Sequence, residues 1–239
     1  MKAVVLAAGF GSRLGELSEH TPKPLVRLAG ETVLEHDLRW LAKSGVREVA
    51  INLHHLGDRI EQIVGDGSAF GLDVRYSRET ELRGTAGALV PLRDFVADEP
   101  FLVVYGDNVF DFDLAALQRA HAGNAAIATL ALFDPQAQPH TGVAGGLVEM
   151  DRGGRVIRFV EGREDHGLRW VNAGCYVVEP SLLQHVPDDR PFDFGRDLFP
   201  LVLRHGGILA GHPIDGYCLG IATPEALARA RAFLGEGVV

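Results

Sequence analysis

The N-terminus constrains the fold of this chain most, because a short apolar run is followed there by a long polar loop. The run from Ala3 to Leu6 contains β-branched residues and is typical of a buried strand in a parallel sheet. The segment from Leu6 to Leu25 reads LAAGFGSRLGELSEHTPKPL. It is far longer than the roughly two to six residues that usually join a strand to a helix, and such long loops are commonly functional. The sequence therefore predicts an α/β protein whose first strand ends in a functional loop.

This loop has the residues expected of a phosphate-binding site. Gly9 and Gly11 allow positive φ angles and a close approach of the backbone, so that N–H groups can face phosphate oxygens. Arg13 can donate a planar fork to a phosphate, and Lys23, held between two prolines, adds a point charge with a restricted aim. The alternative is that the glycines only form a tight turn and that both cations are ordinary surface charges. The combination of all four residues favours phosphate binding.

The pattern LAAGxGxRL, a spacer and then TPKPL resembles the signature of the sugar-1-phosphate nucleotidyltransferases, and the likeness covers nearly the whole chain. The resemblance implies a Rossmann-like three-layer α/β/α sandwich with a mostly parallel mixed sheet, of the nucleotide-diphospho-sugar transferase type. It also implies catalytic roles for Arg13 and Lys23 and a Mg²⁺ cofactor. The nucleotide-binding residues implied in this loop are Leu6, Ala7, Ala8, Gly9, Gly11 and Ser12.

Strand and helix patterns alternate after the loop. Apolar spacing predicts helices from Thr32 to Ser44 and from Gly57 to Val64. Short apolar runs predict strands from Glu48 to Asn52, Asp73 to Ser77 and Phe101 to Tyr105. Such alternation predicts a parallel sheet with helices on both faces.

The second half of the chain is expected to contain more antiparallel structure. A strand is predicted from Ala126 to Leu132, and a β-hairpin is predicted to join Val143 to Met150 with Val156 to Val160. A helix from Pro224 to Leu234 follows. We expect a single domain, 1–239, in which 1–125 mainly bind the nucleotide, 126–220 mainly bind the sugar phosphate and 221–239 form a C-terminal helix.

The segment GTAGAL, from Gly84 to Leu89, is the next candidate for nucleotide contact. In the family this position faces the base, and the segment resembles that of mannose-1-phosphate and D-glycero-D-manno-heptose-1-phosphate guanylyltransferases. The resemblance therefore implies that Gly84, Thr85 and Gly87 bind the nucleotide. Alternatively, Gly84 forms a turn and Thr85 caps a helix. That alternative does not explain Gly87, since glycine inside a helix costs about 1 kcal/mol relative to alanine.

Asp107 follows the predicted strand that ends at Tyr105, and ligands in open α/β sheets bind beyond the carboxyl ends of the strands. The metal-binding aspartate of the family falls on Asp107, although an aspartate in a turn is the alternative. The chain departs from the family at Gly220, where relatives have a second metal-binding aspartate. Either Asp215 reaches the metal from nearby or water replaces the ligand, since Mg²⁺ tolerates several waters.

The resemblance implies that five residues bind the sugar phosphate: Gly142, Glu161, Arg163, Asn172 and Gly174. Carboxylate and amide groups can bond sugar hydroxyls, and glycines leave room for a ring. Where the family usually has Glu-Lys-Pro, this chain has Glu-Gly-Arg ending at Arg163, so the usual lysine is missing. Whether Arg163 supplies that charge is open, because arginine and lysine differ in geometry. The aromatic segment from Pro191 to Pro200 either lines this side or begins a core helix.

Composition excludes several other classes. The net charge of −9 and the lack of a Lys/Arg-rich run argue against a nucleic-acid binder. The length of 239 residues and 46% hydrophobic content suit one globular unit. We expect no signal peptide, no membrane partner and a cytoplasmic location, because every apolar run is short. Cys175 and Cys218 lack CxxC spacing and are expected to be buried free thiols.

The implied reaction joins a nucleoside triphosphate, with GTP favoured, to a sugar 1-phosphate of the mannose or heptose type. The products would be an NDP-sugar and pyrophosphate. The alternatives are a thymidylyl- or uridylyltransferase acting on glucose 1-phosphate, a nucleotidyltransferase for a non-sugar phosphate, and a non-catalytic nucleotide-sugar-binding partner. The sequence leaves the oligomeric state open.

Overall fold

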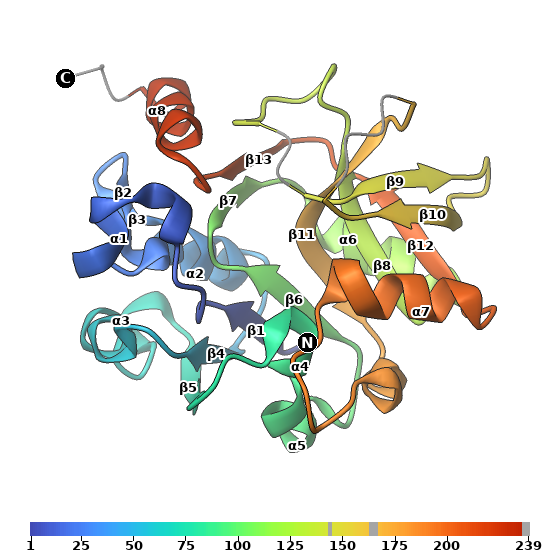
Figure 1. Ribbon diagram of the computed structural model, residues 1–239, viewed down its shortest axis with the longest axis horizontal. Helices are drawn as coiled ribbons and strands as arrows, with labels where there is room; N and C mark the ends of the chain where they lie inside the picture. The colour runs from blue at the N-terminus through green and yellow to red at the C-terminus, as the bar shows by residue number, and fades with distance from the viewer. Residues whose placement is uncertain (143–144, 163–166, 236–239) are drawn as a thin grey trace.

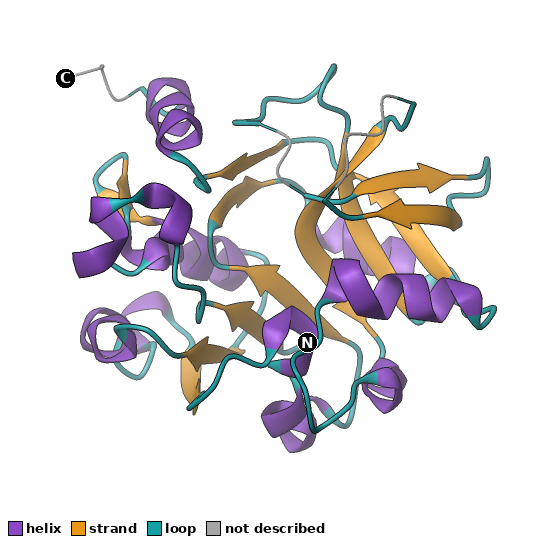
Figure 2. Cartoon of the chain, in the orientation of Figure 1, coloured by secondary structure: helices purple, strands orange, loops and turns teal. Residues whose placement is uncertain are grey.

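A mixed β-sheet forms the centre of the computed structural model, which describes residues 1–142, 145–162 and 167–235. Its strands run in the order β10-β9-β11-β6-β1-β4-β5, and β8 pairs with both β11 and β12. Helices cover both faces of this sheet (Figures 1 and 2). The expected three-layer α/β/α architecture is therefore confirmed.

The sheet has a parallel and a mainly antiparallel part. The parallel strands come from the first half of the chain, and they are β1 (Ala3–Leu6), β4 (Glu48–Leu53), β5 (Asp73–Arg78) and β6 (Phe101–Tyr105). The strands of the second half are β8 (Ala128–Phe133), β9 (Leu147–Met150), β10 (Val156–Val160), β11 (Trp170–Val178) and β12 (Leu209–Pro213). β11 runs antiparallel to β6 and joins the two parts, whereas β12 runs parallel to β8.

Alternate side chains of the strands supply two cores. In β1, Ala3 and Val5 face one core and Val4 faces the other, as the two-residue period of a strand requires. The first core is covered by α2 (Val33–Lys43), α3 (Gly57–Val64) and α6 (Leu114–Ala122). The second is covered by α4 (Gly84–Gly87), α5 (Arg93–Val96) and α7 (Phe199–Arg204). None of the described helices is long and apolar enough to cross a membrane.

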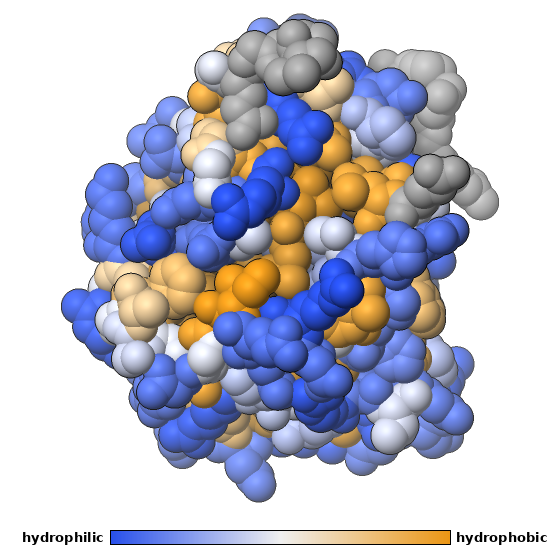
Figure 3. Space-filling model, turned by 90° about the vertical axis from the view of Figure 1, so that its left-hand side faces the viewer, coloured by the Kyte–Doolittle hydropathy of each residue, from blue (hydrophilic) through white to orange (hydrophobic). Residues whose placement is uncertain are grey.

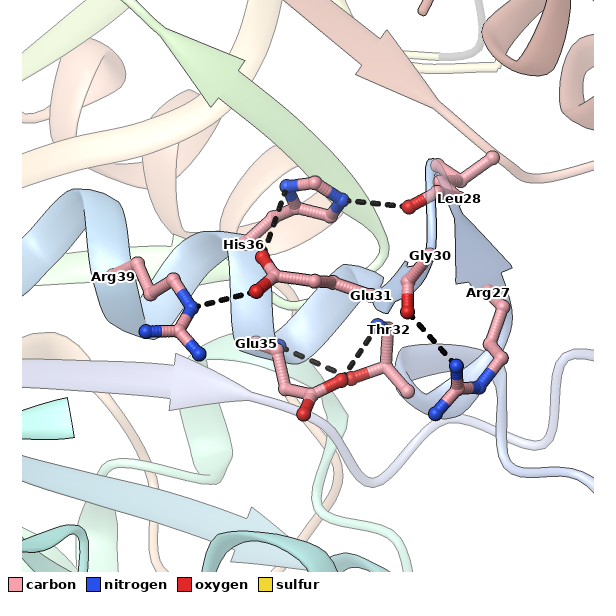
Figure 4. A network of polar contacts seen from close by, with 8 residues as sticks. All are labelled: Arg27, Leu28, Gly30, Glu31, Thr32, Glu35, His36 and Arg39. Atoms are coloured by element: carbon pink, nitrogen blue, oxygen red, sulfur yellow. Dashed lines mark hydrogen bonds and ion pairs between the residues drawn. The ribbon is translucent and has the colours of Figure 1, made fainter. Parts of the chain in front are cut away.

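The start of α2 is fixed by polar contacts (Figure 4). Thr32 Oγ1 accepts a hydrogen bond from Glu35 N, and Glu35 Oε2 accepts one from Thr32 N at 2.7 Å. This reciprocal capping box satisfies two backbone donors at the helix terminus. A small hairpin of β2 (Arg27–Leu28) and β3 (Glu31–Thr32) leads into it, and Glu31 also accepts from Arg39. The capping box therefore gives the physical reason for the predicted start of this helix at Thr32.

The long N-terminal loop has more regular structure than the sequence indicated. It contains a 3₁₀ turn at Ser12–Leu14, the short helix α1 (Glu16–His20) and a second 3₁₀ turn at Lys23–Leu25. Leu14 packs with Leu227 and Ala230 of α8 (Pro224–Phe233) in a third apolar cluster. The loop is therefore held by the C-terminal helix as well as by the sheet.

Several other predicted elements are confirmed, and others were missed. The predicted helix at Gly57–Val64 and strand at Phe101–Tyr105 have the observed bounds. The hairpin β9–β10 is present, but its first strand begins at Leu147, and Val143 lies outside the described residues. Both cysteines are buried and free, as expected. The strands that were not predicted include β2, β3, β7 (Asn108–Asp111), β12 and β13 (Tyr217–Gly220).

Candidate active site

Two pockets adjoin at the carboxyl ends of the parallel strands. The loop pocket has a volume of about 360 Å³ and is lined by the N-terminal loop together with the ends of β4, β5 and β6. The strand pocket has a volume of about 570 Å³ and is lined by segments after β6, by β11 and by the start of α8. The residues that line both pockets are Arg13, Thr85, Tyr105, Asp107, Asp193 and Ala222. We call this shared wall the junction.

The predicted loop residues all reach the loop pocket: Leu6, Ala7, Ala8, Gly9, Gly11 and Ser12. Gly11 has a φ of 65°, and a side chain there would press on Lys23 Cβ at 3.2 Å. Gly9 does not have a positive φ, but the space around it is open. Within the described chain, no backbone acceptor takes the N–H groups of Gly9, Phe10 or Gly11. These donors are therefore available to an anion in the pocket.

A buried chain of hydrogen bonds joins the loop to the GTAGAL segment. Asn52, at the end of β4, accepts from Ala7 N at 2.7 Å and donates to Glu79 Oε1 at 2.6 Å. The second Glu79 oxygen accepts from Arg83 N at 2.9 Å. Asn52 and Glu79 are 4% and 7% exposed, so breaking this chain would leave polar groups unsatisfied away from water. The chain fixes the two sides of the loop pocket relative to each other.

The GTAGAL segment is positioned by the aromatic segment from the other half of the molecule. Ala86 N and Gly87 N both donate to Phe192 O at 2.9 Å. Gly84 has a φ of 75°, and a Cβ there would lie 2.8 Å from Phe192 O. Thr85 N donates to Asp193 Oδ1 at 3.0 Å, and its hydroxyl donates to the same oxygen. Gly84 is required by this packing, while Gly84 and Thr85 also line the loop pocket.

Arg13 and Asp107, two of the charged residues that the sequence singled out, lie at the junction, and Lys23 reaches Asp107 from the loop pocket. The Lys23 ammonium donates to Asp107 Oδ2, and the Lys23 side chain is 9% exposed while that of Asp107 is 34% exposed. Arg13 is exposed and forms no ion pair with the described residues. The ion pair holds Asp107 at the carboxyl end of β6. The guanidinium of Arg13, which has no ion-pair partner among the described residues, faces both pockets. The junction thus offers one unpaired cation to a phosphate.

The strand pocket is lined by four of the predicted sugar-phosphate residues: Gly142, Glu161, Asn172 and Gly174. Burial raises the pKa of Glu161, while the Arg196 charge opposes this shift and the Asp193 charge adds to it. Gly195 makes room for this carboxylate, because a Cβ there would collide with Glu161 Oε2.

A bulge in β11 shapes the floor of the strand pocket. The β11–β8 register shifts between Asn172 and Tyr176, and Gly174 between them has a φ of 77°. The amide of Asn172 donates to Tyr176 Oη at 2.7 Å, and its oxygen accepts from Gly174 N at 3.1 Å. Bulges reorient side chains next to ligand sites.

Some predicted residues are not brought together. Gly87 is buried against Phe192 and lines neither pocket. Asp215 also lines neither pocket, and its Oδ1 accepts from Asp113 N at 3.3 Å, so the structure does not bring it beside Asp107. Arg163 lies outside the described residues. Gly220 does line the strand pocket, but a Cβ there would lie 2.8 Å from Asn108 Oδ1. The Asn108 amide thus occupies the space that a side chain at Gly220 would need.

Sequence reasoning missed several lining residues. Asn52, Glu79 and Tyr105 each stand at or just after the end of a parallel strand. The rule that selected Asp107 would have found them if it had been applied to every strand. Arg196 lies within the aromatic segment from Pro191 to Pro200 and Arg229 lies on the predicted C-terminal helix, but no sequence signal singled out either side chain.

The face that carries α1, α3 and α8 in Figure 1 is turned to the viewer in Figure 3. An apolar band there is bordered by hydrophilic side chains (Figure 3). Phe10 of the N-terminal loop is 50% exposed and lies 5.3 Å from the His54 ring and 5.6 Å from the His55 ring, measured between centroids. Mixed apolar and polar surfaces of this kind are typical of small-molecule sites.

The fold and the two pockets define an α/β protein of the nucleotide-binding type. Its anion-binding groups lie where the N-terminal loop meets the carboxyl ends of the parallel strands. Residues 2–236 match the model described as "Nucleotidyl transferase", and the chain belongs to that family. It is 34% identical over 240 residues to a mannose-1-phosphate guanylyltransferase of Mycobacterium tuberculosis, covering 99% of this chain and 65% of the relative. It is 31% identical over 220 residues to a UTP–glucose-1-phosphate uridylyltransferase of Synechocystis sp., covering 86% and 56%.

Solved structures share the fold. A putative glucose-1-phosphate thymidylyltransferase from Bacillus anthracis, in complex with a sucrose, superposes with a TM-score of 0.86 at 22% identity, covering 100% of this chain and 96% of that one. HddC from Yersinia pseudotuberculosis, complexed with GMP-PN, has a TM-score of 0.79 at 24% identity and coverages of 97% and 98%. The two curated relatives are longer, since the chain spans only 65% and 56% of their lengths.

Proposed function

We propose that this protein transfers a nucleoside monophosphate from a nucleoside triphosphate to a sugar 1-phosphate. The observation that carries the proposal is the junction, where two pockets share a wall containing Arg13 and Asp107. Two substrates bound on either side would meet at these charged groups, and holding reactants together supplies much of the catalytic effect in such transfers.

In the proposed reaction, an oxygen of the sugar phosphate attacks the α-phosphorus of the triphosphate. A new phosphorus–oxygen bond forms, and the bond to the bridging oxygen breaks, so that pyrophosphate leaves with the electron pair. The attacking phosphate is already anionic at neutral pH, so this step requires no general base. Alignment and stabilisation of charge are sufficient.

The residues have separate roles in this proposal. The free N–H groups of the loop and the Arg13 guanidinium would bind the triphosphate and stabilise the departing pyrophosphate. Lys23 would reduce the negative charge of the reacting phosphates and fix Asp107 through their ion pair. Glu161 and Asn172 would face the sugar.

The family resemblance implies a divalent metal ion, and Mg²⁺ is the ion we favour. Among the described residues, no three or more His, Cys, Asp or Glu side chains cluster in a way that could hold a metal. Mg²⁺ is nevertheless commonly held by one or two carboxylates together with waters and substrate phosphates. The Asp107 carboxylate, one of two at the junction with that of Asp193, fits that arrangement, and a bound ion there would neutralise phosphate charge.

GTP and a mannose- or heptose-type sugar phosphate are the favoured substrates. The GTAGAL segment supports guanine, as do a relative named for guanylyl transfer to mannose 1-phosphate and a structural neighbour complexed with GMP-PN. Relatives named for uridylyl and thymidylyl transfer to glucose 1-phosphate make those pairs the main alternatives.

A pyrophosphate-release screen tests the proposal. GTP, UTP, dTTP, ATP and CTP are each combined with mannose, glucose or heptose 1-phosphate, with Mg²⁺ or with EDTA. We expect the highest turnover with GTP and a mannose or heptose phosphate, and loss of turnover with EDTA. Turnover with a non-sugar phosphate alone would reassign the acceptor. Binding of an NDP-sugar without turnover of any pair would identify a non-catalytic binding protein.

A further inference from the structure

One row of residues on α8 faces the strand pocket. Thr223, Ala226 and Arg229 all line it, and their three-residue spacing places them along one side of the helix. Leu227 and Ala230 point instead into the third apolar cluster, with Leu14 of the N-terminal loop. α8 also lies beside β13 (Figure 1). This packing holds the backbone of Arg229 at a fixed place beside the pocket.

The Arg229 guanidinium is available to a ligand. Its Nη2 lies 3.9 Å from where a Cβ on Gly142 would be, which places the guanidinium beside Gly142 at the edge of the pocket. Its Nε donates to Glu225 O of the preceding helical turn at 3.4 Å, and no ion pair joins it to the described residues. An exposed guanidinium with unused donors is suited to bidentate binding of a phosphate.

Two of the three carboxylates that line the same pocket have a cation nearby. Asp107 is paired with Lys23, and Arg196 lies close enough to Glu161 to oppose the rise in its pKa. The third, Asp193, accepts hydrogen bonds from Thr85. Gly220, on β13 next to α8, contributes no side chain to the pocket. The part of the strand pocket beside Gly220 and Gly142 therefore has a cation from α8 and no acidic side chain from β13.

We propose that Arg229 binds the phosphate group of the sugar 1-phosphate. This rests on the proposed function for the chemistry of the ligand. Arg229 lines the strand pocket and not the loop pocket, so it sets the affinity for the sugar phosphate and leaves the affinity for the nucleotide unchanged.

The test compares Arg229→Gln with Arg231→Gln, a control on the same helix whose side chain lines neither pocket. Binding of mannose 1-phosphate and of inorganic phosphate is measured by calorimetry without nucleotide, and KM values for both substrates are measured by pyrophosphate release. For Arg229→Gln we expect about 10- to 100-fold weaker binding of the sugar phosphate, the loss typical of a charge-assisted hydrogen bond. The KM for nucleoside triphosphate should stay within about twofold. Arg229→Lys should recover part of the affinity, because it keeps the charge but not the fork.

The outcomes separate this inference from the proposed function. Unchanged sugar-phosphate affinity in Arg229→Gln, in a protein that turns over, would overturn the inference alone. Weakened binding in a protein that never releases pyrophosphate would support the inference and overturn the proposed function. If neither probe binds the unsubstituted protein, both are overturned. An equal loss in Arg231→Gln would mean that the helix, rather than the Arg229 contact, is responsible.

Discussion

The two pockets are built in different ways, although they share a wall. The loop pocket takes half of its lining residues from one continuous segment, residues 6–24, which includes Gly9 and Gly11. The strand pocket is formed by side chains from β7, β11, β13 and α8 and from the segments between them, which are far apart in sequence. A site made from a single segment leaves a readable motif, whereas a site made from many segments leaves isolated residues. This difference explains why nucleotide binding is easier to infer here than the identity of the sugar.

Thr85 and Asp193 connect the loop pocket and the strand pocket. Thr85 comes from the GTAGAL segment and Asp193 from the aromatic segment, both line both pockets, and two hydrogen bonds join them at the junction. Substitutions on one side should therefore affect mainly one substrate, unless they disturb this connection or the reacting groups themselves.

The largest expected effect comes from the reacting groups. Arg13→Ala or Lys23→Ala should lower turnover about 100-fold or more, because each removes a preorganised charge that stabilises the transferring phosphates. Pyrophosphate release at saturating substrates measures this. Arg119→Ala, whose partner Asp113 lies outside both pockets, is the matched control. Near-normal turnover in both Arg13→Ala and Lys23→Ala would contradict the catalytic role proposed for these residues.

Gly84→Ala should destabilise the protein by about 2 kcal/mol or more, because it combines an unfavourable positive φ with a clash at the Phe192 backbone. Denaturant unfolding measures this loss. Gly45→Ala is the control, since Gly45 has a φ of 89° but open space around it and so reports the backbone strain alone. Equal losses in the two variants would show that the contact between the halves contributes nothing.

Asn52→Ala should raise the KM for the nucleoside triphosphate about 10-fold, because it leaves Ala7 N and Glu79 without their buried partner and frees the loop. The KM for the sugar phosphate should change little. Asn124→Ala, which removes an exposed amide bonded to Ala120 O, is the control. Parallel increases in both KM values would mean that the two pockets do not act separately.

The smallest effect concerns the pH dependence of stability. Asp37 on α2 is fully buried, and neither of its carboxylate oxygens has a hydrogen-bond partner among the described residues. Burial, with a contribution from the Asp107 charge, raises the pKa of Asp37 well above its usual value of 3.8. The folded state then binds this proton more tightly than the unfolded state, so the free energy of unfolding falls as pH rises from about 4 toward the raised pKa.

Asp37→Asn removes this titration. The stability of the variant relative to the parent should rise as pH increases from about 4 toward the raised pKa of Asp37, because only the parent loses stability there. Thermal unfolding across that range measures the change, with the exposed Asp73→Asn as control. Parallel pH profiles for Asp37→Asn and the parent would show that Asp37 is ionised in the folded protein.

The strands and helices with strong local patterns were predictable, whereas pairings over long distances were not. The run from Phe101 to Tyr105 is continuously apolar, and Gly57 to Val64 lies between clear helix signals, so both bounds follow from the sequence. β7 and β13 are four-residue strands that pair with each other across more than a hundred residues of sequence. Short strands of this kind depend on their partner, and no local periodicity marks them.

The same contrast between local patterns and long-distance contacts applies to the predicted site residues. Gly11 and Asp107 were predicted because their positions next to strands have a meaning that does not depend on the rest of the fold. Gly87 was also predicted to bind the nucleotide, yet it lines neither pocket, and its N–H donates to Phe192 O, which comes from a segment more than a hundred residues later. Arg229 reaches the strand pocket only because α8 docks on the N-terminal loop, and that docking is a tertiary event.

The docking of α8 also sets the point during synthesis at which the N-terminal loop can complete its packing. Leu14 is synthesised more than two hundred residues before its partners Leu227 and Ala230. Domains fold as units, and contacts between distant residues form slowly because the chain must close a long loop first. The segment carrying Arg13 therefore has no completed packing until α8 has been synthesised, even though this most recognisable motif is translated long before it.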